Sequence, residues 1–175
     1  MSYCCPHCRG PLQQTGELCT CSSCKFSDNL SKFTKEEKLT QDLFVEGLKC
    51  LQIQDVKGAI QKFSKCLKLQ TEFLHKHHKG LAETQDCLAR CYAMSEEYDK
   101  AIPYLRDSVC TLGKLYGDDS IEYANELHKF AGVLYQAGEV QKGLKVIDEA
   151  VKIFTLHMGE KYELVQELTE MKTCL

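Results

Sequence analysis

The chain has 175 residues, of which 43% are apolar and 27% charged, so it can bury a substantial core and is not expected to be disordered. Its net charge of -3 argues against direct binding of nucleic acid through phosphate neutralisation. No apolar run is long enough to span a membrane and no signal segment opens the sequence, so we expect a cytoplasmic or nuclear protein without membrane contact. In a reducing compartment, the twelve cysteines point to metal ligands or buried thiols rather than disulfides.

The first expected element is a small metal-binding segment over residues 1–30. Two C-x2-C pairs stand in the sequence CCPHCRGPLQQTGELCTCSSC, formed by Cys5 with Cys8 and by Cys21 with Cys24. Each pair can present two thiolates to one ion, and four thiolates complete the tetrahedral coordination of Zn²⁺. The spacing therefore predicts a zinc ribbon with a structural ion, because no coordination position remains open for water or substrate.

The identity of the fourth ligand is open from the spacing alone. Cys19 forms a C-x4-C alternative with Cys24, although the spacing favours Cys21. Gly10 is expected to supply the left-handed step that such a knuckle needs, and Gly16 the tip of a hairpin between the two pairs. Loss of the metal is expected to unfold this segment and to leave the rest of the chain largely intact.

From Lys35 onward, apolar residues recur at helical spacing, and the pattern repeats after 42 residues. Three segments align, namely DVKGAIQKFSKCLKL from Asp55, EYDKAIPYLRDSVCTL from Glu97 and EVQKGLKVIDEAVKIF from Glu139. Small residues that permit close helix crossings superpose at Ala59, Ala101 and Gly143, and in the preceding helix at Gly47, Ala89 and Ala131. Each repeat therefore predicts a helix, a short turn and a second helix.

This pattern predicts an all-α stack of three tetratricopeptide-like helical hairpins over residues 35–175. The usual period is about 34 residues, and the longer period here is similar to that of the kinesin-light-chain-like variant, which LYGDDSIEYANEL at 115–127 also resembles. The last segment, EKYELVQELTEMKTCL, predicts a single helix that caps the third hairpin.

A polar peptide-binding face is expected on the first helices of the hairpins. Its candidate residues are Lys49, Arg90, Asn125 and Lys129. Of these, Lys49, Asn125 and Lys129 form an incomplete version of the basic clamp with which a chaperone cofactor holds a carboxylate. No glycine-rich phosphate loop, serine elbow or HExxH motif is present in the sequence, so we expect no catalytic residues.

The order of cysteine cluster, helical hairpins and tail resembles the C-terminal part of the SET and MYND domain-containing lysine methyltransferases. The likeness is carried by YCCPHCRGPLQ at 3–13, by Cys24 and by the tail at 156–175. In the family's pattern, C-x2-C is followed by C-x4-C. The resemblance therefore implies Cys5, Cys8, Cys19 and Cys24 as ligands and leaves Cys21 as a spare.

The resemblance also implies a parent protein that methylates lysine with S-adenosylmethionine. That activity resides in a SET core preceding this region, beside a separate MYND finger, and neither is expected within this chain. We therefore expect a C-terminal fragment or short isoform that has no cofactor site of its own. Two functions follow as hypotheses: the zinc-binding, protein-interaction module of a methyltransferase, or a free-standing zinc-stapled adaptor. Expected partners are proteins or peptides, among them chaperones or a methylation substrate.

Overall fold

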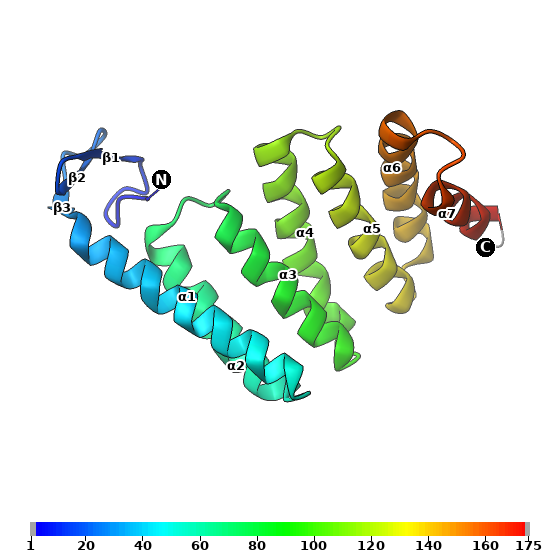
Figure 1. Cartoon of the computed structure of the whole chain (residues 1–175), viewed down its shortest axis with the longest axis horizontal. Coiled ribbons are helices and arrows are strands. Elements are labelled where there is room, and N and C mark those ends of the chain that lie inside the picture. Colours follow the sequence, from blue (N-terminus) through cyan, green and yellow to red (C-terminus); the bar gives the residue numbers. More distant parts are fainter. Residues whose placement is uncertain (1–2, 174–175) are drawn as a thin grey trace. The chain divides into compact units, whose positions relative to one another are not determined.

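A computed structural model of the chain describes residues 3–173. The first two residues of the expected metal-binding segment and the last two of the expected repeat domain lie outside this range. The elements follow in the order β1 (Leu12–Thr15), β2 (Leu18–Cys21), β3 (Ser27–Asn29), α1 (Leu30–Gln52), α2 (Val56–Phe73), α3 (Lys79–Met94), α4 (Tyr98–Tyr116), α5 (Ile121–Gln136), α6 (Val140–Met158) and α7 (Glu163–Thr173) (Figure 1). The predicted helical-repeat fold with a small N-terminal cysteine segment is confirmed. The chain divides into two compact units, Met1–Cys91 and Tyr92–Leu175.

The second helices of the three hairpins begin at equivalent positions. They start at Val56, Tyr98 and Val140, which the sequence places at a constant spacing of 42 residues (98 − 56 and 140 − 98). Before each of them, one residue has a left-handed backbone, with φ of 61° at Gln54, 61° at Glu96 and 77° at Gly138. Such a residue ends a helix by turning the chain away from its axis, and only the third repeat uses the glycine that favours this conformation.

Small residues allow the paired helices to approach closely. In α1, a Cβ atom added at Gly47 would lie 2.7 Å from the ring of Phe63 in α2, closer than side-chain atoms pack. In α6, a Cβ at Gly143 would lie 3.2 Å from the ring of Tyr135 in α5. Ala59, at the position equivalent to Gly143, is fully buried. The alternation of small and large residues therefore sets the distance between the helices of a hairpin.

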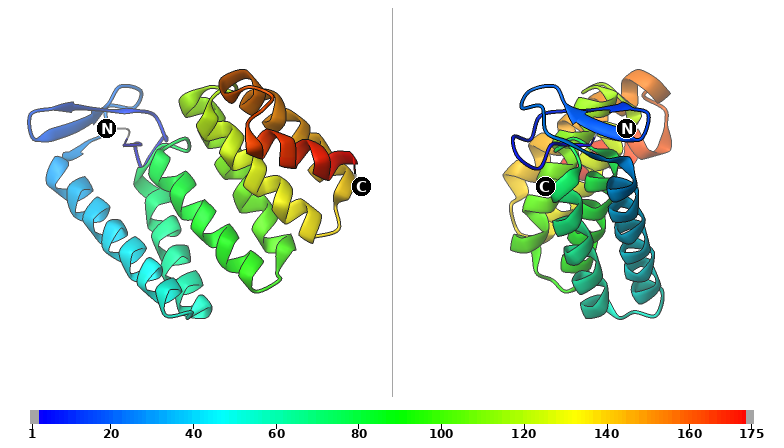
Figure 2. Two further views of the ribbon diagram at one scale, coloured as in Figure 1. Left: turned by 45° about the vertical axis from the view of Figure 1, so that its right-hand side comes forward. Right: turned by 90° about the vertical axis from the view of Figure 1, so that its left-hand side faces the viewer.

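In the first unit, the cysteine segment forms a three-stranded antiparallel sheet beside the ends of α1 and α2 (Figure 2). β1 and β2 form the predicted hairpin, in which Thr15 pairs with Leu18 and Gly16 occupies the turn with φ of 61°. The third strand was not predicted. It leads directly into α1, whose first turn is capped by the side chain of Asn29.

In the second unit, α5 and α6 pack along their length and α7 covers part of their shared core (Figure 2). Val165 and Leu168 of α7 are buried in this core, and Lys172 forms an ion pair with Asp148 of α6. The tail therefore adopts the expected single helix against the third hairpin. Within residues 3–173, no helix combines the length and the apolar character needed to cross a membrane.

Candidate metal centre and repeat surface

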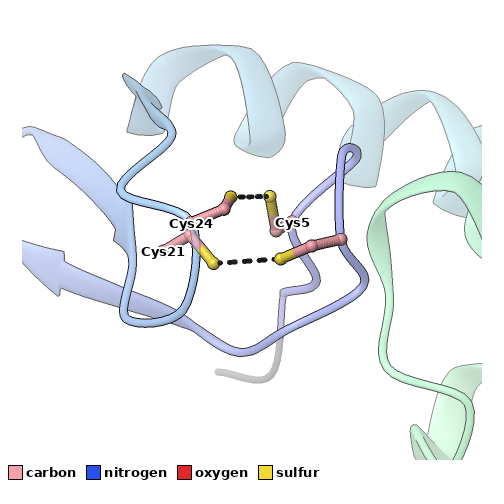
Figure 3. A group of neighbouring side chains, drawn as sticks. Cys5, Cys21 and Cys24 are labelled. Atoms are coloured by element: carbon pink, nitrogen blue, oxygen red, sulfur yellow. Dashed lines mark hydrogen bonds between the residues drawn. The ribbon is translucent and has the colours of Figure 1, made fainter.

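Four thiols of the cysteine segment converge on one point. The Sγ atoms of Cys5, Cys8, Cys21 and Cys24 all lie within 4.8 Å of one another. The two closest pairs join the knuckles, with 3.4 Å between the sulfurs of Cys5 and Cys24 and 3.4 Å between those of Cys8 and Cys21 (Figure 3). Four soft donors at these separations could hold a metal ion.

The two knuckles have the same backbone structure, which accounts for their convergence. The amide of Cys5 donates to the carbonyl of Gly10 at 2.8 Å, and the amide of Cys21 donates to the carbonyl of Phe26 at 2.7 Å. Each bond closes a loop that holds the two cysteines of a pair on the same side. Cys21 is thus the counterpart of Cys5, and Cys24 that of Cys8.

The left-handed step of each knuckle falls on the residue directly after its second cysteine. Arg9 has φ of 61° and Lys25 has φ of 62°. The expectation that Gly10 supplies this step is therefore wrong. Gly10 instead lies against the cluster, where an added Cβ would come within 3.3 Å of the Cys8 sulfur and 3.4 Å of the Cys21 sulfur. A glycine is needed there for space rather than for backbone freedom.

Cys19 is not among the four converging thiols, although the resemblance to the methyltransferases implied it as a ligand. Its side chain is 1% exposed and lies in the core of the first unit, together with the rings of Tyr3, Phe33 and Phe73. Burial in this apolar environment raises the pKa of the Cys19 thiol, so the neutral form is favoured. The structure therefore places Cys19 as a core residue and Cys21 in the cluster.

The two thiols of the second knuckle, Cys21 and Cys24, have very different pKa values. Hydrogen bonds from the backbone amide of Cys24 and then of Ser23, partly opposed by desolvation, lower the pKa of the Cys21 thiol to about 6. At Cys24, the amide of Phe26 favours the thiolate, but the thiol of Cys5, desolvation and the other thiols outweigh it and raise the pKa to about 12. The thiolate form is therefore favoured at Cys21 and disfavoured at Cys24.

Hydrogen bonds join the cysteine segment to the helices. The amide of Cys4 donates to the carbonyl of Phe73 at 2.7 Å, and the guanidinium of Arg9 donates to the carbonyls of Glu72 and Leu74 at 2.9 and 3.1 Å. These carbonyls lie at the end of α2, where helical partners are missing. The Cys4 amide satisfies that of Phe73, and Arg9 satisfies those of Glu72 and Leu74 and places a positive charge at the negative end of the helix dipole.

Aromatic and apolar side chains extend this connection into a continuous core. The ring of Tyr3 stacks on that of Phe33 in α1, with 5.2 Å between their centroids, and its hydroxyl donates to Glu37 at 2.7 Å. Leu12 of the sheet joins the same core as Phe73 of α2. Because the segment and the helices share this core, we now expect loss of the metal to destabilise the ends of α1 and α2 as well.

The candidate peptide-binding residues lie exposed on the expected helices. Lys49 is on α1 and Arg90 on α3, both in the first unit, while Asn125 and Lys129 are on α5 in the second. Lys129 forms an ion pair with Glu126 at 2.5 Å. The structure brings Asn125 and Lys129 onto one helix face, one turn apart, and their role in binding stays a prediction.

A groove in the first unit was missed by the sequence reasoning. It has a volume of about 470 Å³ and runs between α1 and the start of α3, with Phe44, Val45 and Leu48 of α1 along one side. The repeat alignment contains a signal that could have indicated this groove. Val45 and Leu48 occupy the positions at which the third repeat has Lys129 and Gly132, so the hairpin core does not require apolar residues there.

The fold and the cluster define a tetratricopeptide-like repeat protein with an N-terminal four-cysteine cluster that could hold a metal ion. No family model matches the chain. The expected resemblance to the lysine methyltransferases is confirmed: the chain is 30% identical to Protein-lysine N-methyltransferase SMYD4 of Mus musculus over 99% of its own length. A similar match, 31% identical over 97% of this chain, is found with SMYD4 of Gallus gallus. The chain spans 22% of the length of these relatives.

Solved structures show the same fold at low sequence identity. The crystal structure of BtubC (BKLC) from P. vanneervenii has a TM-score of 0.70 at 16% identity and covers 79% of this chain and 56% of that chain. A putative kinesin light chain of Podosopora anserina with TPR-like repeats has a TM-score of 0.62 at 16% identity, covering 84% of this chain and 66% of that chain. These likenesses support the predicted long-period hairpin fold.

Proposed function

We propose that this chain is the C-terminal zinc-binding and protein-interaction region of a SET and MYND-type protein-lysine methyltransferase. The observation that carries the proposal is the match to the SMYD4 proteins over nearly the whole chain, cysteine segment and repeats together. Lysine methylation with S-adenosylmethionine then belongs to the SET core of the full-length protein, in the cytoplasm or the nucleus, and this region supplies binding.

Zinc is the metal that fits the cluster. A tetrahedral Zn²⁺ with bonds of about 2.3 Å to thiolates holds its sulfurs about 3.8 Å apart. The four sulfurs lie within 4.8 Å of one another, and the two closest pairs are at 3.4 Å, so small movements would complete this geometry. We assign Cys5, Cys8, Cys21 and Cys24 as ligands. With four protein thiolates the ion has no open position, so its role is to cross-link the two knuckles rather than to activate a substrate.

The helical repeats, over residues 35–175, are the proposed binding domain, and the segment 1–30 is the proposed zinc domain. Exposed charges of both signs on the first helices favour polar, salt-sensitive contacts with protein partners such as a chaperone or a methylation substrate. The alternative, a free-standing zinc-stapled adaptor, would make the same contacts without a methyltransferase in the complex.

Calorimetry and affinity capture test the proposal. We expect no heat of binding when S-adenosylmethionine is titrated into the chain, and native mass spectrometry should show one zinc per chain. Capture from cell extract should return proteins that are lost with Arg90→Glu or Lys129→Glu. Binding of the cofactor, or captured proteins that do not change with either charge reversal, would contradict the assignment of this chain as the binding region.

A further inference from the structure

The lining of the groove in the first unit combines apolar side chains with two carboxylates. Val45 and Leu48 are 42% and 37% exposed, which is high for large apolar side chains of a helix that packs on its neighbour. The lining also includes the carboxylates of Glu37 on α1 and Glu83 on α3. All of these residues belong to the first unit.

The described residues that line the groove provide no fixed positive charge to balance the two carboxylates. None of the described lining residues is a lysine or an arginine. His78 also lines the groove, and its burial lowers the pKa of its imidazole, which is therefore neutral at pH 7. Lys79 approaches Glu83 at 3.5 Å, but both side chains are more than half exposed, so this pair is weak and easily exchanged.

The groove also has an unused hydrogen-bond acceptor beneath its surface. Gln70 of α2 lines the groove and is 7% exposed, and its Oε1 has no hydrogen-bond partner in the part of the chain that the structure describes. A buried acceptor without a partner is destabilising, and a donor group of a ligand would satisfy it. Glu37, by contrast, is held in place by the hydroxyl of Tyr3 at 2.7 Å and keeps further lone pairs for a ligand.

We propose that this groove receives a basic side chain, lysine or arginine, of a partner protein segment whose neighbouring apolar residue packs on Val45 and Leu48. A lysine or arginine combines an apolar stem with a terminal group that only donates hydrogen bonds, which matches an apolar wall leading to carboxylates and an amide oxygen. The proposal rests on the proposed protein-binding function and specifies its ligand and its site.

The test uses fluorescence anisotropy with three labelled heptapeptides, capped at both ends, in which the central residue between two leucines is lysine, arginine or glutamate. The lysine or the arginine peptide should bind the full chain at low salt and dissociate as salt is raised, whereas the glutamate peptide should not bind. The difference between lysine and arginine shows which basic group the groove prefers. Equal binding of the basic and acidic peptides would overturn the proposal.

Two sets of variants place the binding in the groove. Glu37→Gln combined with Glu83→Gln should weaken the basic peptide about threefold to tenfold, the effect of two exposed ion pairs, and Leu48→Ser should weaken it further. The matched control, Glu160→Gln combined with Glu167→Gln, removes two exposed carboxylates of the second unit and should change nothing. Circular dichroism and thermal unfolding identify a variant that has lost its fold.

Failure of this inference is distinguishable from failure of the proposed function. If proteins are captured in an Arg90-dependent way but the groove variants bind the basic peptide like the parent chain, the groove assignment is wrong and the interaction module stands. If no protein is captured yet the peptide binds with the expected dependence on Glu37 and Glu83, the groove assignment stands and the broader proposal fails.

Discussion

Replacing Cys21 by serine should abolish zinc binding at physiological concentrations. Structural zinc sites contribute about 10–16 kcal/mol, so one of four ligands corresponds to roughly 2.5–4 kcal/mol, or about 100- to 1,000-fold in affinity. Cys21 carries this share because its sulfur lies 3.4 Å from that of Cys8 in the cluster. Its thiol also deprotonates more readily than an ordinary cysteine, with its pKa lowered to about 6 chiefly by the amide of Cys24.

Cys19→Ser is the matched control, two residues away on the same strand. Cys19 is 1% exposed among apolar side chains, so a hydroxyl placed there without a partner should cost about 1–3 kcal/mol of stability. The cluster itself is untouched. The two variants should therefore differ in zinc content. Cys21→Ser loses zinc, whereas Cys19→Ser keeps one zinc per chain while its melting temperature falls.

Native mass spectrometry gives the zinc content, and competition with a chromogenic chelator gives the affinity. Thermal unfolding followed by circular dichroism supplies the stability of each variant. Loss of zinc in Cys19→Ser with retention in Cys21→Ser would refute the ligand assignment and restore the C-x4-C pattern of the methyltransferases. Equal weakening in both variants would contradict the assignment of Cys21, and not Cys19, as a ligand.

Four further substitutions test the packing. Gly10→Ala places a Cβ 2.9 Å from the Ser23 hydroxyl and 3.3 Å from the Cys8 sulfur, and should weaken zinc about tenfold in chelator competition. Gly47→Ala should destabilise the chain in urea, because the cost of overpacking, about 1–3 kcal/mol, exceeds the gain in helix propensity of about 1 kcal/mol. Its control, Gly132→Ala, places the Cβ in open space and should stabilise the chain. Ala101→Leu should cost about 1–3 kcal/mol, and parental stability would contradict the 42-residue register.

The sequence by itself determined the features that depend on neighbouring residues. The starts of α2, α4 and α6 could be predicted because helical periodicity and the turn before each helix are local properties that recur with the repeat. The pairing of Cys5 with Cys8 and of Cys21 with Cys24 was equally accessible, because two residues between cysteines are enough for both thiolates to reach one ion.

Only the tertiary structure shows that Cys21, and not Cys19, is among the four converging thiols. Both lie on β2 and, two residues apart, on the same face of the strand, so their spacing distinguishes them weakly. Cys21 ends the strand opposite Leu12 and begins the second knuckle, whereas Cys19 lies further along the strand, opposite Gln14. The choice depends on which helix ends the sheet packs against, and those contacts come from residues far away in the sequence.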